Sequence, residues 1–163
     1  MTLHELNTLP KQQLKEELMK CCGSSAWARS MAAARPFATL DAMVIAGDAI
    51  WRALAPADWL EAFAAHPKIG EQGSGSPWST REQSGMQAAT DDVRRRLASG
   101  NTAFLSRFGY IFIICATGKT AADLLRALEA RLSNDPAVEL RVAAEEQRKI
   151  TGLRLARLMD GHS

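Results

Sequence analysis

The sequence predicts an all-α protein, a single-domain bundle of about seven to nine helices over residues 1–163. Pro, Gly, Ser and Thr interrupt the chain at intervals typical of helix boundaries. Between them, apolar residues recur every three to four positions, which is the helical period. Only residues 110–116 have the β-branched and aromatic content of a strand, and a single strand has no partner.

The first half of the chain contains four predicted helices. They cover residues 10–21, the stretch from Ser24 or Ser25 to just before Pro36, residues 39–54 and residues 56–65. In the first helix Leu14 and Leu18 are in phase, and Gly23 stops it. Ser24 or Ser25 can cap the second, and Pro56 suits the first turn of the fourth.

The second half contains a serine- and glycine-rich loop and three predicted helices. The loop covers residues 71–78, and the helices cover residues 79–108, with a break or bend around Gly100, then 119–132 and 135 to about 159. Asp135 and Pro136 open the last helix. We expect residues 110–116 to be an extended or helical segment buried among helices, and Gly118 to form a turn.

Composition excludes several classes of protein. With 47% hydrophobic and 23% charged residues the chain is typical of a soluble globular domain. A net charge of +2 is too small to indicate a nucleic-acid partner, and the basic cluster at residues 94–96 is expected to be a solvated helix face. The longest apolar run is far short of the roughly 20 residues that span a bilayer, so no membrane role is expected.

Cysteine usage predicts a reducing, cytoplasmic location. There are three cysteines, two of them adjacent, and the first residues lack the apolar core of a signal peptide. No histidine or cysteine has a metal-ligand partner at a familiar spacing. Cys115 lies in an apolar run that disfavours a thiolate nucleophile. The stretch "ATGKT" resembles a phosphate-binding loop, but Ile113 occupies the position of its first glycine.

His66 is the best candidate for an acid or base. The other two histidines lie near the chain termini, so only His66 combines a central position with an ordinary pKa close to neutrality. Pro67 disfavours helical backbone at the residue before it, so the helix of residues 56–65 should stop close to His66. The alternative is a helix C-cap histidine that bonds the terminal carbonyls.

Ser79 and Glu82 have the spacing of a capping box, in which each side chain bonds a backbone amide of the other. Capping alone would explain both residues. The functional alternative is that the Glu82 carboxylate, ionised near a helix N-terminus, orients or charges an imidazole and forms an acid–base pair with it.

Arg154 shares a predicted helix face with Gln147, Ile150 and Leu158. An arginine among core residues requires an anion or carbonyl oxygens. The alternative is that its stem covers apolar surface while the guanidinium reaches water.

Four ordered motifs, "HPKIGE", "STREQSGM", "RFGYIFIICATGKT" and "KITGLRLARL", together resemble the 2-oxo-4-hydroxy-4-carboxy-5-ureidoimidazoline (OHCU) decarboxylases of uric acid degradation. The upstream stretch "CCGSSAWARSMAAARPF" fits this family too, so the resemblance covers nearly the whole chain. It implies an all-α homodimer without a cofactor that converts OHCU to (S)-allantoin and carbon dioxide.

The resemblance also implies roles for individual residues. His66 would be the catalytic acid or base, paired with Glu82. The residues expected to bind substrate are Pro67, Ser79, Thr80, Arg81, Gln83, Phe112, Ile114, Cys115, Ala116, Thr117, Gly118 and Arg154. Arg157 lies one turn from Arg154 and is the other candidate for the clamp on polar substrate atoms. The alternative to an enzyme is a helical protein-interaction module, in which His66 and Glu82 serve only as caps.

Overall fold

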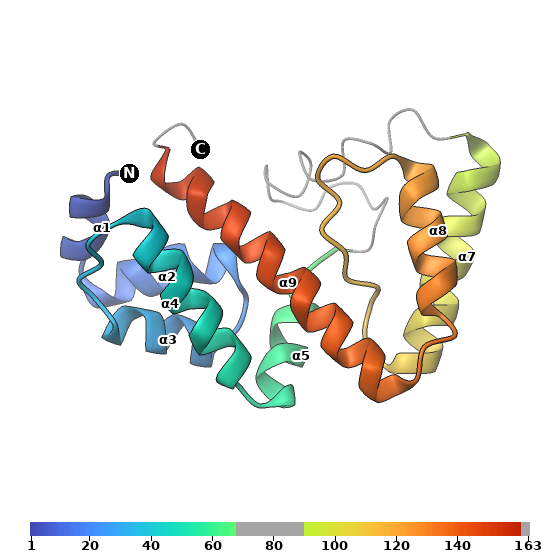
Figure 1. The fold of residues 1–163 in the computed structure, drawn as a ribbon, viewed down its shortest axis with the longest axis horizontal. Helices are drawn as coiled ribbons and strands as arrows, with labels where there is room; N and C mark the ends of the chain where they lie inside the picture. The colour runs from blue at the N-terminus through green and yellow to red at the C-terminus, as the bar shows by residue number, and fades with distance from the viewer. Residues whose placement is uncertain (68–89, 161–163) are drawn as a thin grey trace. The chain divides into compact units, whose positions relative to one another are not determined.

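The fold of residues 1–67 and 90–160 is described by a computed structural model, in which these residues form helices and connecting segments but no strand (Figure 1). The helices are α1 (Leu3–Thr8), α2 (Lys11–Cys21), α3 (Ser25–Ala33), α4 (Leu40–Ala53), α5 (Pro56–Ala64), α7 (Asp91–Phe108), α8 (Ala121–Arg131) and α9 (Pro136–Met159). The all-α prediction is therefore confirmed. None of these helices has the length and apolar character that crossing a bilayer requires.

The chain divides into two compact units, Met1–Ala65 with Gln147–Ser163, and His66–Glu146. Helix α9 contributes its first half to the second unit and its second half to the first. The expectation of one domain over residues 1–163 stays a prediction.

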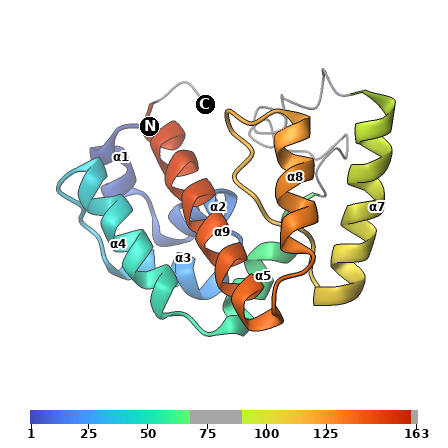
Figure 2. The ribbon, with the colours of Figure 1, turned by 45° about the vertical axis from the view of Figure 1, so that its right-hand side comes forward.

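The first unit packs α1 to α5 around a core of large apolar side chains. Helix α3 lies beside α2 and α4 (Figure 2). Trp27 is fully buried, and its indole Nε1 donates to the carbonyl of Gly47 on α4 at 3.1 Å. A methyl group at Gly47 would lie 3.4 Å from the Trp27 ring, which is an ordinary van der Waals contact, so the two helices pack closely here. The contact therefore joins α3 to α4 by both packing and a hydrogen bond.

Two helix starts in the first unit follow the predicted chemistry. Ser24 caps α3 by accepting from the amide of Trp27 at 3.2 Å, and Pro56 opens α5. Thr39, expected as the first residue of its helix, is instead the N-cap of α4. The short helix α1 is absent from the sequence prediction. Its start is fixed by a capping box between Thr2 and Glu5.

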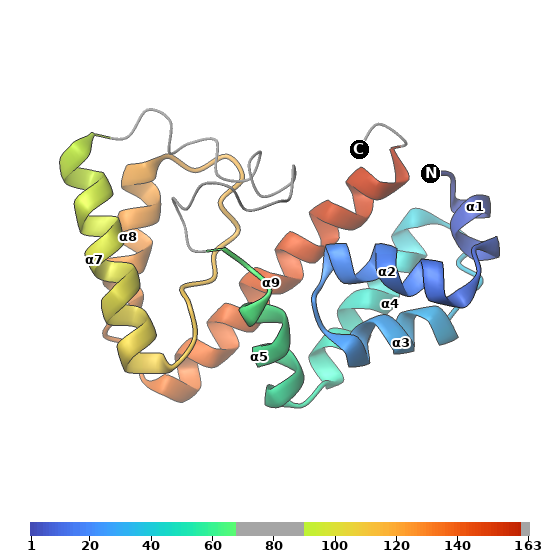
Figure 3. The same cartoon turned by 180° about the vertical axis from the view of Figure 1, so that it is seen from behind.

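The second unit is built on α7 and α8, which lie side by side (Figure 3). Two expectations for α7 are wrong. The first is a continuous helix from residue 79 to residue 108. Thr90 has an extended backbone and caps the N-terminus of α7 with its side chain, so α7 begins only at Asp91. No break occurs at Gly100, where a methyl group would lie 2.5 Å from Leu128 Cδ2. Glycine in a helix interior costs roughly 1 kcal/mol relative to alanine, but α7 continues through Gly100 and packs there against the Leu128 side chain of α8.

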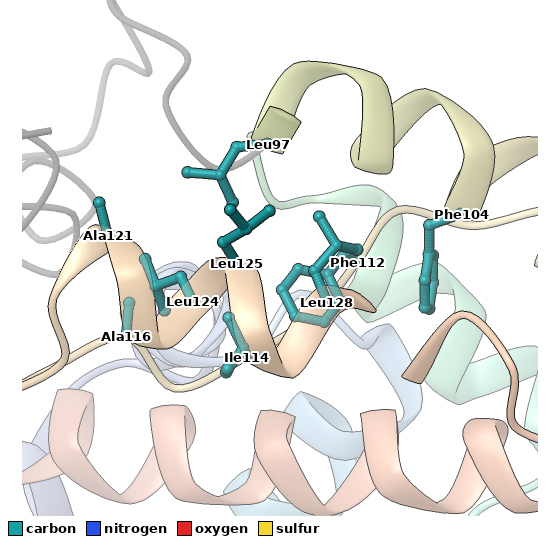
Figure 4. Packing of buried hydrophobic residues seen from close by; sticks show 9 residues of the cluster. All are labelled: Leu97, Phe104, Phe112, Ile114, Ala116, Ala121, Leu124, Leu125 and Leu128. Atoms are coloured by element: carbon teal, nitrogen blue, oxygen red, sulfur yellow. The ribbon is translucent and has the colours of Figure 1, made fainter. Parts of the chain in front are cut away.

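Residues 111–116 cross the second unit without regular hydrogen-bonded structure, as predicted for the apolar run. Their alternate side chains, Phe112, Ile114 and Ala116, enter one apolar cluster (Figure 4). The other members are Leu97, Phe104, Ala121, Leu124, Leu125 and Leu128. The segment has strand composition because both of its faces are buried, although no strand pairs with it in the part of the chain described here.

A buried ion pair between Arg131 and Glu139 packs against this apolar cluster. The guanidinium of Arg131 donates to both carboxylate oxygens of Glu139, from Nε at 3.0 and 3.1 Å and from Nη2 at 2.5 Å. Glu139 is fully buried, and Arg131 is 8% exposed. The guanidinium also lies over the Phe112 ring, 4.5 Å from its centroid. The pair thus connects α8, α9 and the extended segment.

Burial of Cys21 and Cys22 predicts a loss of stability in alkali. Burial raises the pKa of each thiol from 9.0 to about 12. Above pH 9 the unfolded chain releases these protons while the folded protein retains them, so the free energy of unfolding falls as pH rises toward 12. The loss should be about 1 kcal/mol per thiol and pH unit. Melting temperatures between about pH 8 and about pH 10.5 measure it. Cys21→Ala/Cys22→Ala should show a shallower slope, and an unchanged slope would contradict this assignment.

Candidate active site

His66 follows directly after the end of α5, as the His-Pro pair predicts. The last helical residue is Ala64, and Ala65 is the C-cap, donating its amide to the carbonyl of Ala62 at 3.2 Å. His66 is therefore one residue beyond the cap position. Its side chain is half-buried, as is Pro67. A half-buried imidazole on a backbone fixed by both a helix and a proline is suited to proton transfer in a defined geometry.

The segment containing Phe112, Ile114, Cys115 and Ala116 is buried throughout, whereas Thr117 and Gly118 are exposed. The amide of Lys119 donates to the carbonyl of Ala116 at 3.0 Å, and Gly118 has φ 78°. This is the positive φ that the third residue of a type II turn requires. The predicted turn at Gly118 is confirmed.

The side chains of this segment differ in what they can offer a ligand. Phe112, Ile114 and Ala116 are committed to the apolar cluster of the second unit, so packing accounts for their side chains. The alternate residue Cys115 is outside that cluster. A substrate could therefore be bound by this segment through its backbone and through Thr117 and Gly118.

Glu146 holds the backbone of the segment and was missed by the sequence analysis. Glu146 is 9% exposed, and its carboxylate accepts from the Cys115 amide at 3.1 Å. A charged acceptor on a backbone donor is one of the stronger hydrogen bonds in proteins, and it replaces a pairing that a neighbouring strand would supply. The available signal was the position of Glu146 on the buried face of α9, three residues after Ala143 and four before Ile150.

Arg154 lies in the other unit and is buried, with 7% of its surface exposed. Gln147, Ile150 and Leu158 are buried with it, so the predicted shared face of α9 is confirmed and the solvent-reaching alternative is wrong. Its Nη1 donates to the carbonyl of Lys20 at 3.5 Å, at the C-terminal end of α2. A guanidinium is favourable there because the last carbonyls of a helix lack partners within it. Arg157 is only half-buried.

The remaining site predictions fall outside the described residues. They are Ser79, Thr80, Arg81, Glu82 and Gln83. In residues 1–67 and 90–160, no three His, Cys, Asp or Glu side chains form a group that could hold a metal ion.

The basic cluster of residues 94–96 is exposed, as predicted. Arg96 donates to both oxygens of Glu129 on α8, at 3.1 and 2.8 Å. Arg96 thus forms an exposed ion pair with Glu129.

Comparison with known proteins identifies the family. The model of the OHCU decarboxylase family matches residues 7–156. The chain is 43% identical over 151 residues to the "Uric acid degradation bifunctional protein TTL" of Arabidopsis thaliana, covering 88% of this chain and 47% of that protein. It is 38% identical over 104 residues to the OHCU decarboxylase of Mus musculus, covering 60% of this chain and 58% of the mouse protein. The chain thus spans about half the length of these two relatives.

A solved structure shares the fold. The crystal structure of an OHCU decarboxylase in the presence of (S)-allantoin superposes with a TM-score of 0.80 at 40% identity, covering 89% of this chain and 98% of that one. This agreement extends over all but a small part of both chains. Together with the match of the family model over residues 7–156, it shows that the chain belongs to the OHCU decarboxylase family.

Proposed function

We propose that this chain is an enzyme that decarboxylates OHCU to (S)-allantoin and carbon dioxide in uric acid degradation, and that residues 1–163 act as one OHCU decarboxylase-like domain. The observation that supports this most is the family match over residues 7–156. The position of His66, immediately after the end of α5, is consistent with it, because the proposed reaction needs a fixed proton donor or acceptor.

The reaction requires a place for the electron pair left when the carbon–carboxylate bond breaks. Many decarboxylases use a cofactor as this electron sink. In OHCU the carboxylated carbon bears a hydroxyl group and adjoins a ring carbon that is doubly bonded to nitrogen. The electrons of the breaking bond can move into that imine, so we propose catalysis without a cofactor or metal.

The protein then has three tasks, which are to hold the carboxylate out of the ring plane, to exchange protons with the substrate, and to protonate one face. We assign the proton transfers to His66 paired with Glu82, and substrate orientation to Pro67, the polar residues 79–81 and Gln83. The segment of residues 112–118, anchored at Cys115 by Glu146, forms the opposite wall. Arg154 binds polar atoms of the substrate.

We further propose that the protein acts as a cytoplasmic homodimer. All three cysteines are buried and none forms a disulfide, which is compatible with a reducing compartment.

The activity is tested by incubating the purified protein with freshly generated OHCU and following the optical rotation of the allantoin formed. We expect (S)-allantoin to form faster than in the uncatalysed control. The rate should be unchanged after exhaustive dialysis against a chelator. Racemic allantoin at the uncatalysed rate would refute the activity, and recovery that depends on an added metal or cofactor would refute the mechanism.

Two substitutions at Glu82 separate capping from catalysis. Glu82→Gln should leave the melting temperature almost unchanged, because a capping box accepts glutamine as well as glutamate. Its turnover should fall by about 10²-fold or more, because a neutral amide cannot hold His66 in its charged form or take up a proton. Glu82→Ala should lower both turnover and melting temperature. Wild-type turnover in Glu82→Gln would identify Glu82 as a cap only.

A further inference from the structure

The turn between α2 and α3 packs against the end of α5, the helix that leads to His66. A methyl group at Gly23 would lie 2.6 Å from the Cβ of Ala65 and 3.7 Å from the Cα of Ala62. Carbon atoms in ordinary contact are 3.4–4 Å apart, so position 23 has room only for hydrogen. Gly23 is not one of the glycines with positive φ, so this requirement comes from space and not from backbone conformation.

A second contact ties the same two elements together. Glu61, one helical turn before Ala65, accepts from the Ser25 amide at 3.0 Å through Oε1 and from the Ser25 hydroxyl at 2.5 Å through Oε2. Ser25 is the first residue of α3, so its amide has no acceptor within the helix. The Glu61 carboxylate therefore satisfies this donor and lies at the positive end of the α3 dipole.

The two contacts fix different parts of the last turn of α5. Gly23 allows the segment of residues 22–24 to approach the backbone of α5, and Glu61 links α5 to the first residue of α3 through two hydrogen bonds. Ala62 and Phe63, between them, are fully buried. The residue bonded to Ala65 is His66, so the backbone that carries the imidazole starts from this anchored turn.

We propose that Gly23 and Glu61 are positioning residues, which fix the end of α5 and thereby the place of the His66 imidazole. The proposal rests on the proposed function only in giving His66 its catalytic role. A displacement of about 1 Å in a catalytic group can cost about 10²-fold in rate. A methyl group at position 23 forces a movement of that order, because neither Cβ can rotate away from the other.

The decisive experiment is a compensating pair of substitutions. Gly23→Ala adds the methyl group that collides with Ala65, and Ala65→Gly removes its opposing atom. We expect Gly23→Ala to lower kcat by about 10- to 10²-fold with little change in KM, because neither residue binds substrate. Gly23→Ala/Ala65→Gly should return kcat to within about threefold of Ala65→Gly alone, since the next nearest atom is then 3.7 Å away.

A readout independent of activity separates this proposal from the proposed function. The chain has three histidines, so the ring signals of His66 can be assigned in a proton NMR spectrum by comparison with His66→Ala. Gly23→Ala should shift these signals, and the double variant should restore them. Signals that move and are restored while turnover never changes would uphold the positioning and refute the catalytic role of His66. Signals unchanged by Gly23→Ala would overturn the positioning.

Glu61 provides a second test should Gly23→Ala fail to fold. Glu61→Leu removes both acceptors for Ser25 and should shift the His66 signals and lower kcat. Glu61→Gln keeps one oxygen acceptor and should show the smaller effect of the two. If both variants leave the His66 signals in place, Glu61 has no positioning role and the proposal is wrong.

Discussion

Replacement of His66 by alanine is expected to lower turnover of OHCU by about 10²–10⁴-fold, the usual contribution of a positioned acid or base. The helices should remain, because His66 lies beyond the C-cap of α5 and its side chain is only half-buried. Far-ultraviolet circular dichroism and the initial rate of (S)-allantoin formation measure the two effects separately.

His4→Ala is the matched control, since His4 is an exposed histidine on α1. Its rate and circular dichroism should equal those of the unmodified protein. If His66→Ala keeps most of the turnover, the acid–base assignment is refuted even though the family and the fold stand.

The largest expected effect on stability comes from Glu139. Glu139→Ala should lower the free energy of unfolding by about 3–5 kcal/mol, because Arg131 would remain buried without its carboxylate. Denaturant unfolding followed by circular dichroism gives this difference. It is a large share of the roughly 5–15 kcal/mol by which a typical domain is stable.

Two controls show that the cost comes from an uncompensated charge. Arg131→Met/Glu139→Leu removes both charges and should be far less destabilising than Glu139→Ala, because a buried pair is replaced by apolar groups. Glu129→Ala breaks the exposed pair with Arg96, whose side chains are 46% and 51% exposed, and should cost under about 1 kcal/mol. A double variant as unstable as Glu139→Ala would contradict the explanation.

Local signals in the sequence predicted most of the helix boundaries. Ser24 and Pro56 have local side-chain or backbone preferences that act within three residues, and the structure uses both as expected. The prediction of a break at Gly100 was wrong because it considered only a local preference. Helix propensity disfavours glycine there, but the helix continues and packs against Leu128, which is far away in sequence.

The difference between local signals and contacts distant in sequence also decides which residues of the candidate site could be predicted. His66 was found because the other two histidines lie near the termini and Pro67 predicts that a helix ends beside it, and Arg154 was found because its helix face is apolar. The contact of Glu146 with Cys115 spans 31 residues, and no local rule predicts it. The approach of Gly23 to Ala65 is likewise visible only when two distant segments are placed together.

The buried segment of residues 110–116 has a further consequence for the unfolded chain. Its sequence, "YIFIICA", has high β-propensity and contains no charge, proline or glycine, which are the features of segments that form amyloid-like stacks. In the folded protein the apolar cluster and the Glu146 hydrogen bond keep its core inaccessible. Arg107 and Lys119 flank it in the sequence, as charged residues that oppose aggregation often do. Any variant that opens the second unit, Glu139→Ala included, should therefore precipitate through this segment and bind thioflavin T.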